Sequence, residues 1–301
     1  MSRKSICETV RERCLASDGG WGTFLQEQGL EPGECPELWC LEKPDKVAQA
    51  AEAYIRAGAD MIQSNSFGGS RYKLDMFGVG DRTYEINRAA AQISRQAAGE
   101  DHWVISSLGP SGKMLMMGEV TEEELYDVFR EQCEALAEGG ADAICVETMS
   151  AIDEASIAVR AARENTDLEV ISTFVFSPGQ QENEYRTMMG VSPAEAARAA
   201  LDAGAQIIGS NCGNGLEGMI EVIRQMRQAV GTDAPMLVHG NAGLPQLVDG
   251  QEIFPETPGM MAAHVPELLR AGTQIVGGCC GTTPEHVTAV KKAVEKFNNQ
   301  G

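Results

Sequence analysis

Aromatic and basic side chains are scarce in this chain of 301 residues. Aromatic residues make up 5% of it, and 24 lysines and arginines stand against 44 aspartates and glutamates, for a formal net charge of −20. A field of that sign repels phosphate backbones and anionic lipid surfaces, which argues against nucleic acid and membrane surfaces as partners. No apolar run reaches the roughly 18 to 20 residues that a membrane-spanning helix needs.

We also expect no secretory signal, because residues 1–5 lead directly into a charged amphipathic stretch. The nine cysteines are an odd number spread over a long chain, which is not the pattern of a disulfide framework. We therefore expect a cytoplasmic protein whose cysteines serve as metal ligands or as small core residues. Cys7, Cys14, Cys133 and Cys145 stand in helix-like or strand-like contexts and are expected in the core.

A repeated pattern organises the chain into strand and helix units. In four places a helix-like stretch stops at a glycine, and a short apolar strand begins three residues later; the glycines are Gly58, Gly140, Gly204 and Gly272. Glycine commonly ends helices because it adopts the left-handed conformation without strain. Each interval between these glycines is about twice the roughly 30 residues of one βα unit, so a further strand is expected in each interval.

One more strand ahead of the first repeat brings the expected total to eight. The strands are predicted near residues 14–17, 61–62, 104–108, 143–144, 170–176, 207–208, 236–239 and 275–276. Helix signals lie between them, such as the capping box at Thr121 and the proline that follows Ser192. The pattern predicts an α/β fold, a single (β/α)8 TIM barrel over residues 1–301, with a doubly wound open sheet as the alternative. The stretch 244–260 is expected to be a long loop.

The same repeat predicts where an active site would lie. Seven residues after each repeat glycine stands a polar or metal-binding residue: Asn65, Glu147, Asn211 and Cys279. An equal offset means an equal height at the carboxyl end of each strand, which is the rim where TIM-barrel enzymes build their active sites. Turn chemistry alone would account for Asn65 and Asn211, but less well for Glu147, which follows an apolar strand.

Three cysteines on this predicted rim have the chemistry of a metal site. Cys212 follows Asn211, and Cys279 and Cys280 stand side by side in a Gly-Gly-Cys-Cys-Gly run. Three thiolates suit a borderline cation such as zinc, and three protein ligands leave open the position that a catalytic zinc site keeps for its substrate. Core packing, or a disulfide between Cys279 and Cys280, is the alternative. A zinc hydrolase is disfavoured, because three thiolates activate water poorly compared with histidine-rich sites.

The first strand runs into the turn Asp18-Gly19-Gly20-Trp21. Glycines there would let the backbone approach a ligand, and Asp18 would lie on the rim. A turn or helix cap is the alternative role for Asp18, and the spacing departs from the G-x-G-x-x-G of dinucleotide-binding loops. At the end of the seventh strand, His239 is expected in the core or behind the site instead of as a ligand.

These segments together resemble the homocysteine S-methyltransferase family over about residues 12–295. The motifs that carry the resemblance are Asp18-Gly19-Gly20 with Gly22-Thr23, Asn65-Ser66-Phe67-Gly68, Glu147-Thr148-Met149, Arg186-Thr187, residues 190–193, Asn211-Cys212, residues 241–245 and residues 277–284. The Gly-Gly-Cys-Cys-Gly block with the upstream Asn-Cys pair is the most specific of them. Residues 211–215 and 241–245 look most like the homocysteine-binding domain of cobalamin-dependent methionine synthase.

The resemblance implies a zinc-dependent TIM barrel that methylates the thiol of homocysteine to give methionine. Matched residue by residue, Cys212, Cys279 and Cys280 would hold Zn²⁺, and the homocysteine thiolate would take the fourth position. Asn241 would offer its side-chain oxygen at that position before the substrate arrives. The expected substrate contacts are Asp18 and Glu147 for the ammonium group, backbone N–H groups near Gly19 and Gly20 for the carboxylate, and Asn65 on the rim.

These residues leave the methyl donor open. Members of the family use methylcobalamin, S-methylmethionine, S-adenosylmethionine or betaine. The chain contains no D-x-H-x-x-G corrinoid-binding motif, so the resemblance implies methylcobalamin on a separate corrinoid protein, with an S-methylmethionine- or betaine-type donor as the alternative. Trp21 and Gly240 depart from the family pattern beside the expected pocket. A different acceptor thiol, or a regulatory protein that binds zinc and thiol without turnover, is therefore a further alternative.

Overall fold

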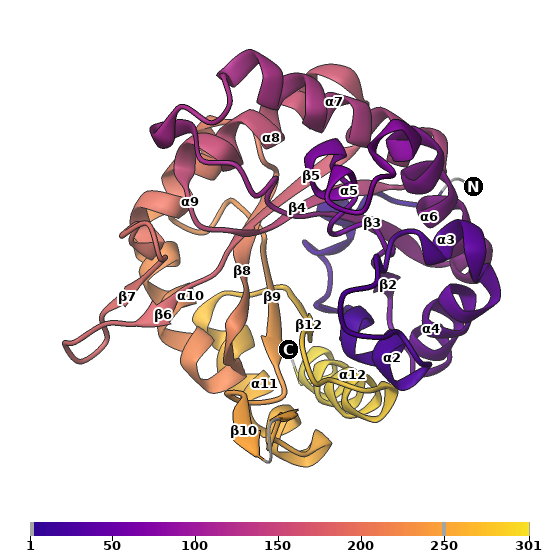
Figure 1. Ribbon diagram of the computed structural model, residues 1–301. Coiled ribbons are helices and arrows are strands. Elements are labelled where there is room, and N and C mark those ends of the chain that lie inside the picture. Colours follow the sequence, from indigo (N-terminus) through magenta and orange to yellow (C-terminus); the bar gives the residue numbers. More distant parts are fainter. Residues whose placement is uncertain (1–2, 249–250, 301) are drawn as a thin grey trace.

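The computed structural model describes residues 3–248 and 251–300, which form a (β/α)8 barrel (Figure 1). Eight parallel strands pair in the order β1-β12-β9-β8-β5-β4-β3-β2. Asp60 donates its backbone N–H to the Ala16 carbonyl at 2.8 Å, which joins the first and second strands and closes the sheet. The TIM-barrel prediction is confirmed, and the doubly wound alternative is wrong. The strands are β1 (Leu15–Ala16), β2 (Met61–Ile62), β3 (Trp103–Leu108), β4 (Ala143–Met149), β5 (Glu169–Phe174), β8 (Ile207–Gly215), β9 (Met236–Asn241) and β12 (Ile275–Gly278).

Helices surround the barrel, and several of them begin at a capping residue. The longer ones are α4 (Pro44–Arg56), α6 (Thr83–Ala98), α7 (Glu122–Glu138), α8 (Ile152–Asn165), α9 (Pro193–Asp202), α10 (Leu216–Val230), α11 (Pro258–Ala271) and α12 (Pro284–Asn298). Shorter turns are α1 (Ile6–Thr9), α2 (Trp21–Glu27), α3 (Trp39–Glu42), α5 (Arg71–Asp75), η1 (Gly80–Arg82) and η2 (Leu115–Met117). Thr121 caps α7 and Ser192 caps α9, each with a reciprocal glutamate three residues on. Within the described ranges, no helix combines the length and hydropathy of a membrane-spanning segment.

The four repeat glycines end their helices in the left-handed conformation. Gly58, Gly140, Gly204 and Gly272 have φ values of 96°, 96°, 104° and 117°. A side chain at such a φ would be strained, which explains why glycine recurs there. The repeat therefore has a backbone cause, and it sets the common starting height of the strands that follow.

The expected long loop at 244–260 is wrong in part. Residues 246–248 (β10, Gln246–Val248) and residues 251–253 (β11, Gln251–Ile253) pair as antiparallel strands, and α11 already begins at Pro258. The hairpin pairs Gln246 with Ile253, Leu247 with Glu252 and Val248 with Gln251. Residues 249–250 of the expected loop lie outside the described residues. A second short hairpin, β6 (Ser177–Pro178) with β7 (Tyr185–Arg186), leaves the barrel after β5.

Two layers of side chains fill the barrel, and they differ in polarity. Successive residues of a strand point to opposite faces, so every second residue points inward. The lower layer is buried and apolar: Leu15, Met61, Ile105, Cys145, Ile171, Ile207, Leu237 and Ile275. The layer two residues further along each strand is buried and mostly polar: Ser17, Gln63, Ser107, Glu147, Thr173, Gly209, His239 and Gly277. The apolar layer thus supports a polar floor at the carboxyl end of the barrel.

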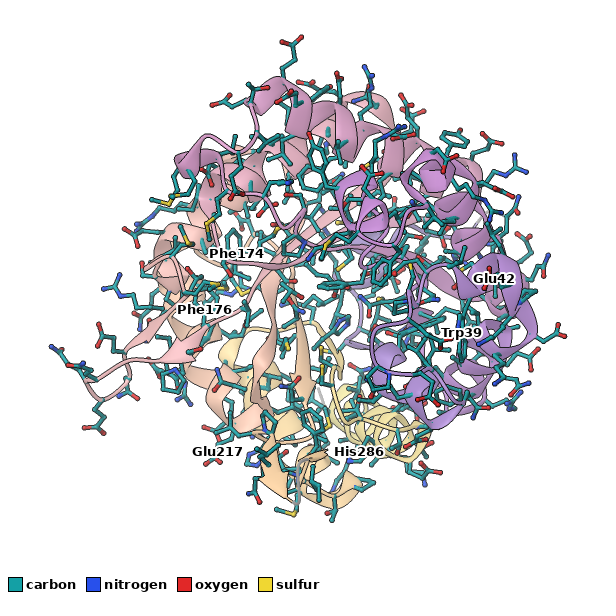
Figure 2. All side chains as sticks on the ribbon, in the orientation of Figure 1. Trp39, Glu42, Phe174, Phe176, Glu217 and His286 are labelled. Atoms are coloured by element: carbon teal, nitrogen blue, oxygen red, sulfur yellow. The ribbon has the colours of Figure 1, made fainter. Side chains whose placement is uncertain are left out.

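Apolar side chains also fill the space between the strands and the helices (Figure 2). Trp39 packs among α2, α4 and α6 and is 2% exposed. Phe174 and Phe176 belong to a separate cluster on the side of α8 and α9. Cys133 and Cys145 are buried as expected, whereas Cys7 and Cys14 are only partly buried.

Candidate active site

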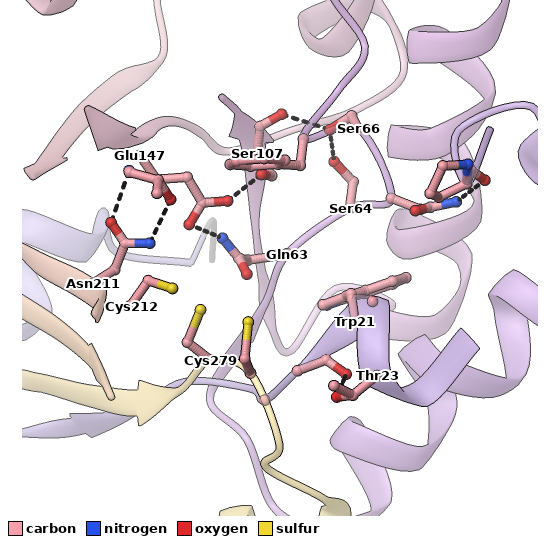
Figure 3. A pocket seen from close by; sticks show the side chains of 18 of the residues that line it. Trp21, Thr23, Gln63, Ser64, Ser66, Ser107, Glu147, Asn211, Cys212 and Cys279 are labelled. Atoms are coloured by element: carbon pink, nitrogen blue, oxygen red, sulfur yellow. Dashed lines mark hydrogen bonds between the residues drawn. The ribbon is translucent and has the colours of Figure 1, made fainter. Parts of the chain in front are cut away.

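Three cysteines converge at the carboxyl end of the barrel. Cys212 lies near the end of β8, and Cys279 and Cys280 directly follow β12; β9 lies between these two strands. The three sulfur atoms lie within 4.8 Å of one another, and all three residues are free thiols (Figure 3). The convergence predicted from the sequence is therefore present, and a disulfide between the adjacent pair is not.

Local backbone geometry explains how two separate strands aim their sulfurs at one point. Cys212 has a φ of 58°, an uncommon left-handed conformation for a residue with a side chain. The pairing of β8 with β9 shifts register just there, between Asn211 and Gly215. Strained backbone of this kind persists where the surrounding structure holds it, and it is frequent at functional sites. On the other strand, Cys279 donates its N–H to the Gly240 carbonyl at 2.7 Å, which ties the Cys-Cys pair to β9.

The three thiols share protons unequally. Hydrogen bonds donated by the thiols of Cys279 and then Cys280 lower the pKa of Cys212. The same contacts with Cys212 raise the pKa of Cys279 and of Cys280. Cys212 is therefore the thiol of the cluster that loses its proton most readily, and a bound cation would favour the loss of the other two protons.

Glu147 lies across the cavity from the sulfurs, at the end of β4. Its carboxylate accepts hydrogen bonds from Gln63 Nε2 at 2.8 Å and from the Ser107 hydroxyl. Burial raises the pKa of Glu147 to about 7, although both hydrogen bonds oppose that rise. A carboxyl group poised near neutrality can accept a positively charged ligand group with little further loss of solvation.

Asp18 lies at the end of β1, but its carboxylate does not line the cavity. The side chain is fully buried, and its Oδ2 accepts the indole N–H of Trp21 at 2.7 Å and the backbone N–H of Gln63 at 2.6 Å. Burial raises its pKa to about 6. The neighbouring Gly19 and Gly20 do line the cavity.

Gly20 shows why the turn after β1 needs glycine. A Cβ built there would lie 2.6 Å from the Cys279 carbonyl oxygen, so no larger residue fits without movement. The Gly20 N–H already donates to Thr282 Oγ1 at 2.9 Å. The turn is therefore packed directly against the Cys-Cys segment.

One cavity of about 320 Å³ joins the groups described above. The three cysteines, Glu147, Asn65, Trp21 and the glycines of the first turn all line it. Asn65 donates its side-chain N–H to the Pro36 carbonyl at 2.7 Å. Asn241 and Asp18 stand behind this lining.

Several cavity residues were missed at the sequence level. Gln63 and Ser107 belong to the polar layer and follow apolar strand residues by the two-residue period, so the strand pattern could have identified them. Glu37 also lines the cavity, from a loop, and its Oε1 accepts the Gly68 N–H at 2.6 Å. No pattern in the sequence marks Glu37 as a cavity residue.

Comparison with known proteins identifies the family. The family model described as Homocysteine S-methyltransferase matches residues 15–294. The chain belongs to the homocysteine S-methyltransferase family. The chain is similar to two methionine synthases. The methionine synthase of Mycobacterium leprae (strain TN) is 30% identical over 309 residues, and the match covers 98% of this chain and 25% of that protein. The methionine synthase of Mycobacterium tuberculosis (strain ATCC 25618 / H37Rv) is 29% identical over 304 residues, and the match covers 96% of this chain and 25% of that protein. The chain thus spans about a quarter of the length of these relatives.

Among solved structures, the metallated form of the homocysteine methyltransferase MmuM from Escherichia coli has the same fold. It superposes with a TM-score of 0.77 at 20% sequence identity, covering 95% of this chain and 98% of that chain. A methyltransferase from Methanosarcina mazei superposes with a TM-score of 0.63 at 12% identity, covering 98% and 99%. At these identities the likeness concerns the barrel alone.

The donor set of this homocysteine S-methyltransferase family member fits a zinc ion. Three sulfurs within 4.8 Å of one another match the thiolate preference of zinc. The side-chain oxygen of Asn241, at the end of β9, is buried and has no hydrogen-bond partner within residues 3–248 and 251–300, although Asn241 contacts Cys212. A buried oxygen without a partner is costly unless something occupies it, so this amide is available as a fourth ligand.

His239 lies two residues before Asn241 and is not part of the cysteine cluster. It is 1% exposed, and burial lowers its pKa to about 4, so the ring is neutral. It belongs to the polar layer beneath the cavity, where the sequence analysis expected it.

Proposed function

We propose that the chain transfers a methyl group to the thiol of homocysteine, giving methionine, at a zinc ion held by Cys212, Cys279 and Cys280. The observation that carries this proposal is a single cavity that holds three convergent free sulfurs on one side and a buried carboxylate, Glu147, on the other. Sulfur chemistry and amino-acid recognition thus have separate groups in the same cavity.

The cysteines would prepare the acceptor sulfur for reaction. Zinc bound to them would supply the charge that lets the homocysteine thiol lose its proton, and the thiolate is the reactive form. The summed negative charge of three cysteinate ligands exceeds the positive charge of one divalent cation. The acceptor sulfur bound beside them would therefore stay electron-rich. Asn241 would hold the fourth position until the acceptor arrives. The sulfur then forms its bond to the methyl carbon while the bond to the donor breaks, and the electron pair leaves with the donor.

Glu147 would bind the ammonium group of homocysteine. Gln63 and Ser107 fix the orientation of its carboxylate, so a cation meets an acceptor already in place. Asn65 and backbone N–H groups near Gly19 and Gly20 remain the proposed partners of the rest of the amino acid, and the Gly20 N–H would have to exchange its bond to Thr282 Oγ1 for one to the substrate. A simple thiol without an amine would lack the contact with Glu147, which selects an amino acid.

We propose a methyl-corrinoid carried on a separate protein as the methyl donor. Similarity to two methionine synthases supports this choice. An apolar surface beside the active site supports it too: a second cavity of about 390 Å³ shares Thr148 with the first and is lined by Met114, Met116, Met188 and Met189. Met116 and Met188 are 71% and 82% exposed. Exposed methionines adapt to varied partner surfaces. A corrinoid protein that presents its methyl group at this rim would need such a surface to dock on.

A donor panel with homocysteine held fixed tests the proposal. Methionine formation would be compared with methylcobalamin, S-methylmethionine, S-adenosylmethionine and betaine. We expect methylcobalamin to support turnover and the others to give little or none. Turnover with S-methylmethionine alone would replace the proposed donor. No methionine with any donor, at any concentration of zinc-loaded protein, would instead favour a protein that binds zinc and thiol without catalysis.

A further inference from the structure

Two strands that flank β5 leave the regular strand conformation where they reach the cavity. Thr148 on β4 and Cys212 on β8 have φ values of 61° and 58°, and only one other non-glycine residue in the described part of the chain has a positive φ. The pairing of β4 with β5 and that of β8 with β9 shift register around these two residues. A left-handed conformation is an outlier for a β-branched residue such as threonine, so the surrounding structure must hold it there.

The left-handed residues let each strand present two successive residues to the cavity. In a regular strand, successive side chains point to opposite faces of the sheet. Glu147 and Thr148 nevertheless both line the cavity, and so do Asn211 and Cys212. In both pairs the second residue is the left-handed one. Without this distortion the strand alternation would turn the Cys212 sulfur away from the cavity.

The side chain of Asn211 joins the two distorted segments (Figure 3). Its Oδ1 accepts the backbone N–H of Thr148 at 2.8 Å and the hydroxyl of Thr173 at 2.7 Å, and its Nδ2 donates to Thr148 Oγ1 at 2.7 Å. The backbone N–H of Thr148 belongs to the peptide bond that follows Glu147, and the carbonyl of Asn211 belongs to the peptide bond that leads into Cys212. One buried amide therefore links the backbone beside the carboxylate to the backbone beside the sulfur.

An uncharged amide is well suited to this link. β5 lies between β4 and β8, so the bonds of Asn211 join three neighbouring strands. The amide both donates and accepts, which satisfies a backbone N–H and a threonine oxygen together. An aspartate would add a negative charge to a cavity that already holds three thiols and a carboxylate.

We propose that Asn211 is a positioning residue that holds Glu147 and Cys212 in fixed positions relative to one another, so that one side chain sets both the metal side and the amino-acid side of the cavity. The inference rests on the proposed function, because it states how the same cavity holds zinc and homocysteine together. Asn211 acts through the backbone of Thr148 and Cys212.

A double-mutant cycle between Asn211 and Thr148 tests the proposal. Asn211→Ala removes all three hydrogen bonds, Thr148→Val removes the hydroxyl and keeps the branched shape, and Thr148→Ser keeps the hydroxyl. Asn298→Ala is the matched control. Asn298 also exchanges two hydrogen bonds with one residue, Cys14, but it does so at the amino end of the barrel.

Two binding measurements report on the two sides without turnover. Cobalt(II) is the probe for the metal side, because it follows zinc in its choice of ligands and its visible absorption reports both occupancy and coordination geometry. Methionine is the probe for the amino-acid side, and its binding to the zinc-loaded protein would be measured by calorimetry. Each variant would be compared with the wild type in both measurements.

Loss of the link should weaken both sides at once. We expect Asn211→Ala to reduce the affinities for cobalt and for methionine by about tenfold each, and Thr148→Val to reduce both by about threefold to fivefold. Thr148→Ser should recover most of the affinity that Thr148→Val loses. The cobalt absorption bands should change in Asn211→Ala and stay unchanged in Asn298→Ala. The losses should not add in Asn211→Ala/Thr148→Val, because the two residues share the same bonds.

Two results would overturn the proposal. One is a Thr148→Val variant that binds cobalt as tightly as the wild type. The other is full additivity of the losses in the double variant, because the two residues would then act independently. If Asn211→Ala does not fold, the comparison of Thr148→Val with Thr148→Ser makes the same test. If the wild-type protein methylates no thiol, the proposed function fails, while cobalt and methionine binding still decide whether Asn211 couples the two sides.

Discussion

The two sides of the cavity are built in opposite ways. On the sulfur side, the thiols of β8 and of the segment after β12 contact mainly one another, and the neighbouring Asn241 oxygen has no hydrogen-bond partner among the described residues. On the carboxylate side, Glu147 and Asp18 accept hydrogen bonds from Trp21, Gln63 and Ser107. The sulfurs thus contact mainly other sulfurs, whereas the carboxylates are held by hydrogen bonds from the surrounding protein.

This difference assigns a different task to each side. Ligand atoms without partners are costly in a folded protein, and a cation bound there removes the cost. Carboxylates that already accept protein hydrogen bonds are fixed in orientation before a substrate arrives, so little reorganisation accompanies binding. Loss of a sulfur should therefore abolish a site, whereas loss of a hydrogen bond on the carboxylate side should weaken binding by a graded amount.

The largest effect is expected from Cys212→Ala on the sulfur side. Two remaining thiols bind zinc far more weakly than three, so the variant should lose most of its zinc and methylate homocysteine at least about a thousandfold more slowly. Zinc content by elemental analysis and methionine formation would be measured together. Cys14→Ala, a free and partly buried thiol outside the cluster, is the control and should keep both. Full zinc and full activity in Cys212→Ala would refute the ligand assignment.

The sulfur side could be predicted from the sequence, and the carboxylate side only in part. Cys212, Cys279 and Cys280 follow glycine-ended repeats, so equal spacing along the chain translates directly into equal height on the barrel. Asp18 also follows a strand, but its carboxylate accepts hydrogen bonds from the Trp21 side chain and the Gln63 backbone, and spacing along the chain does not encode these contacts. Glu37 enters the cavity from an irregular loop, where no period relates sequence to position.

Glu147→Gln should give the next largest effect, and on the carboxylate side alone. Losing a charged hydrogen bond to the ammonium group should weaken homocysteine binding by about 1.5 to 3 kcal/mol, while zinc content stays unchanged. Calorimetric titration of the zinc-loaded protein with homocysteine would measure the difference. Glu154→Gln is a matched control, because Glu154 is also buried but lies outside the active-site cavity. Equal losses of zinc and homocysteine in Glu147→Gln would contradict the division between the two sides.

The pH dependence of binding tests the same carboxylate without a change in its contacts. Burial raises the pKa of Glu147 to about 7, and an ammonium group binds the ionised form, so affinity should rise with pH and level off above that value. Methionine is the suitable ligand, because its sulfur carries no titratable proton. We expect its affinity to increase by about fivefold or more from about pH 6 to about pH 7.5. The rise in affinity with pH should disappear in Glu147→Gln. A rise that persists in this variant would assign the titration to another group. Asp18 would be the first group to test, because burial raises its pKa to about 6.

The smallest effect should come from Ser107→Ala, which removes one of the donors that orient Glu147. The remaining bond from Gln63 keeps the carboxylate in the cavity, so homocysteine binding should weaken by about 1 kcal/mol, roughly fivefold. Ser106→Ala is a closely matched control on the same strand, because the Ser106 hydroxyl is buried, points to the other face of β3 and has no hydrogen-bond partner in the described part of the chain. Ser106→Ala should leave homocysteine affinity unchanged. If the two alanine variants bind homocysteine equally well, orientation by hydrogen bonds does not matter on the carboxylate side, and the contrast with the sulfur side reduces to charge alone.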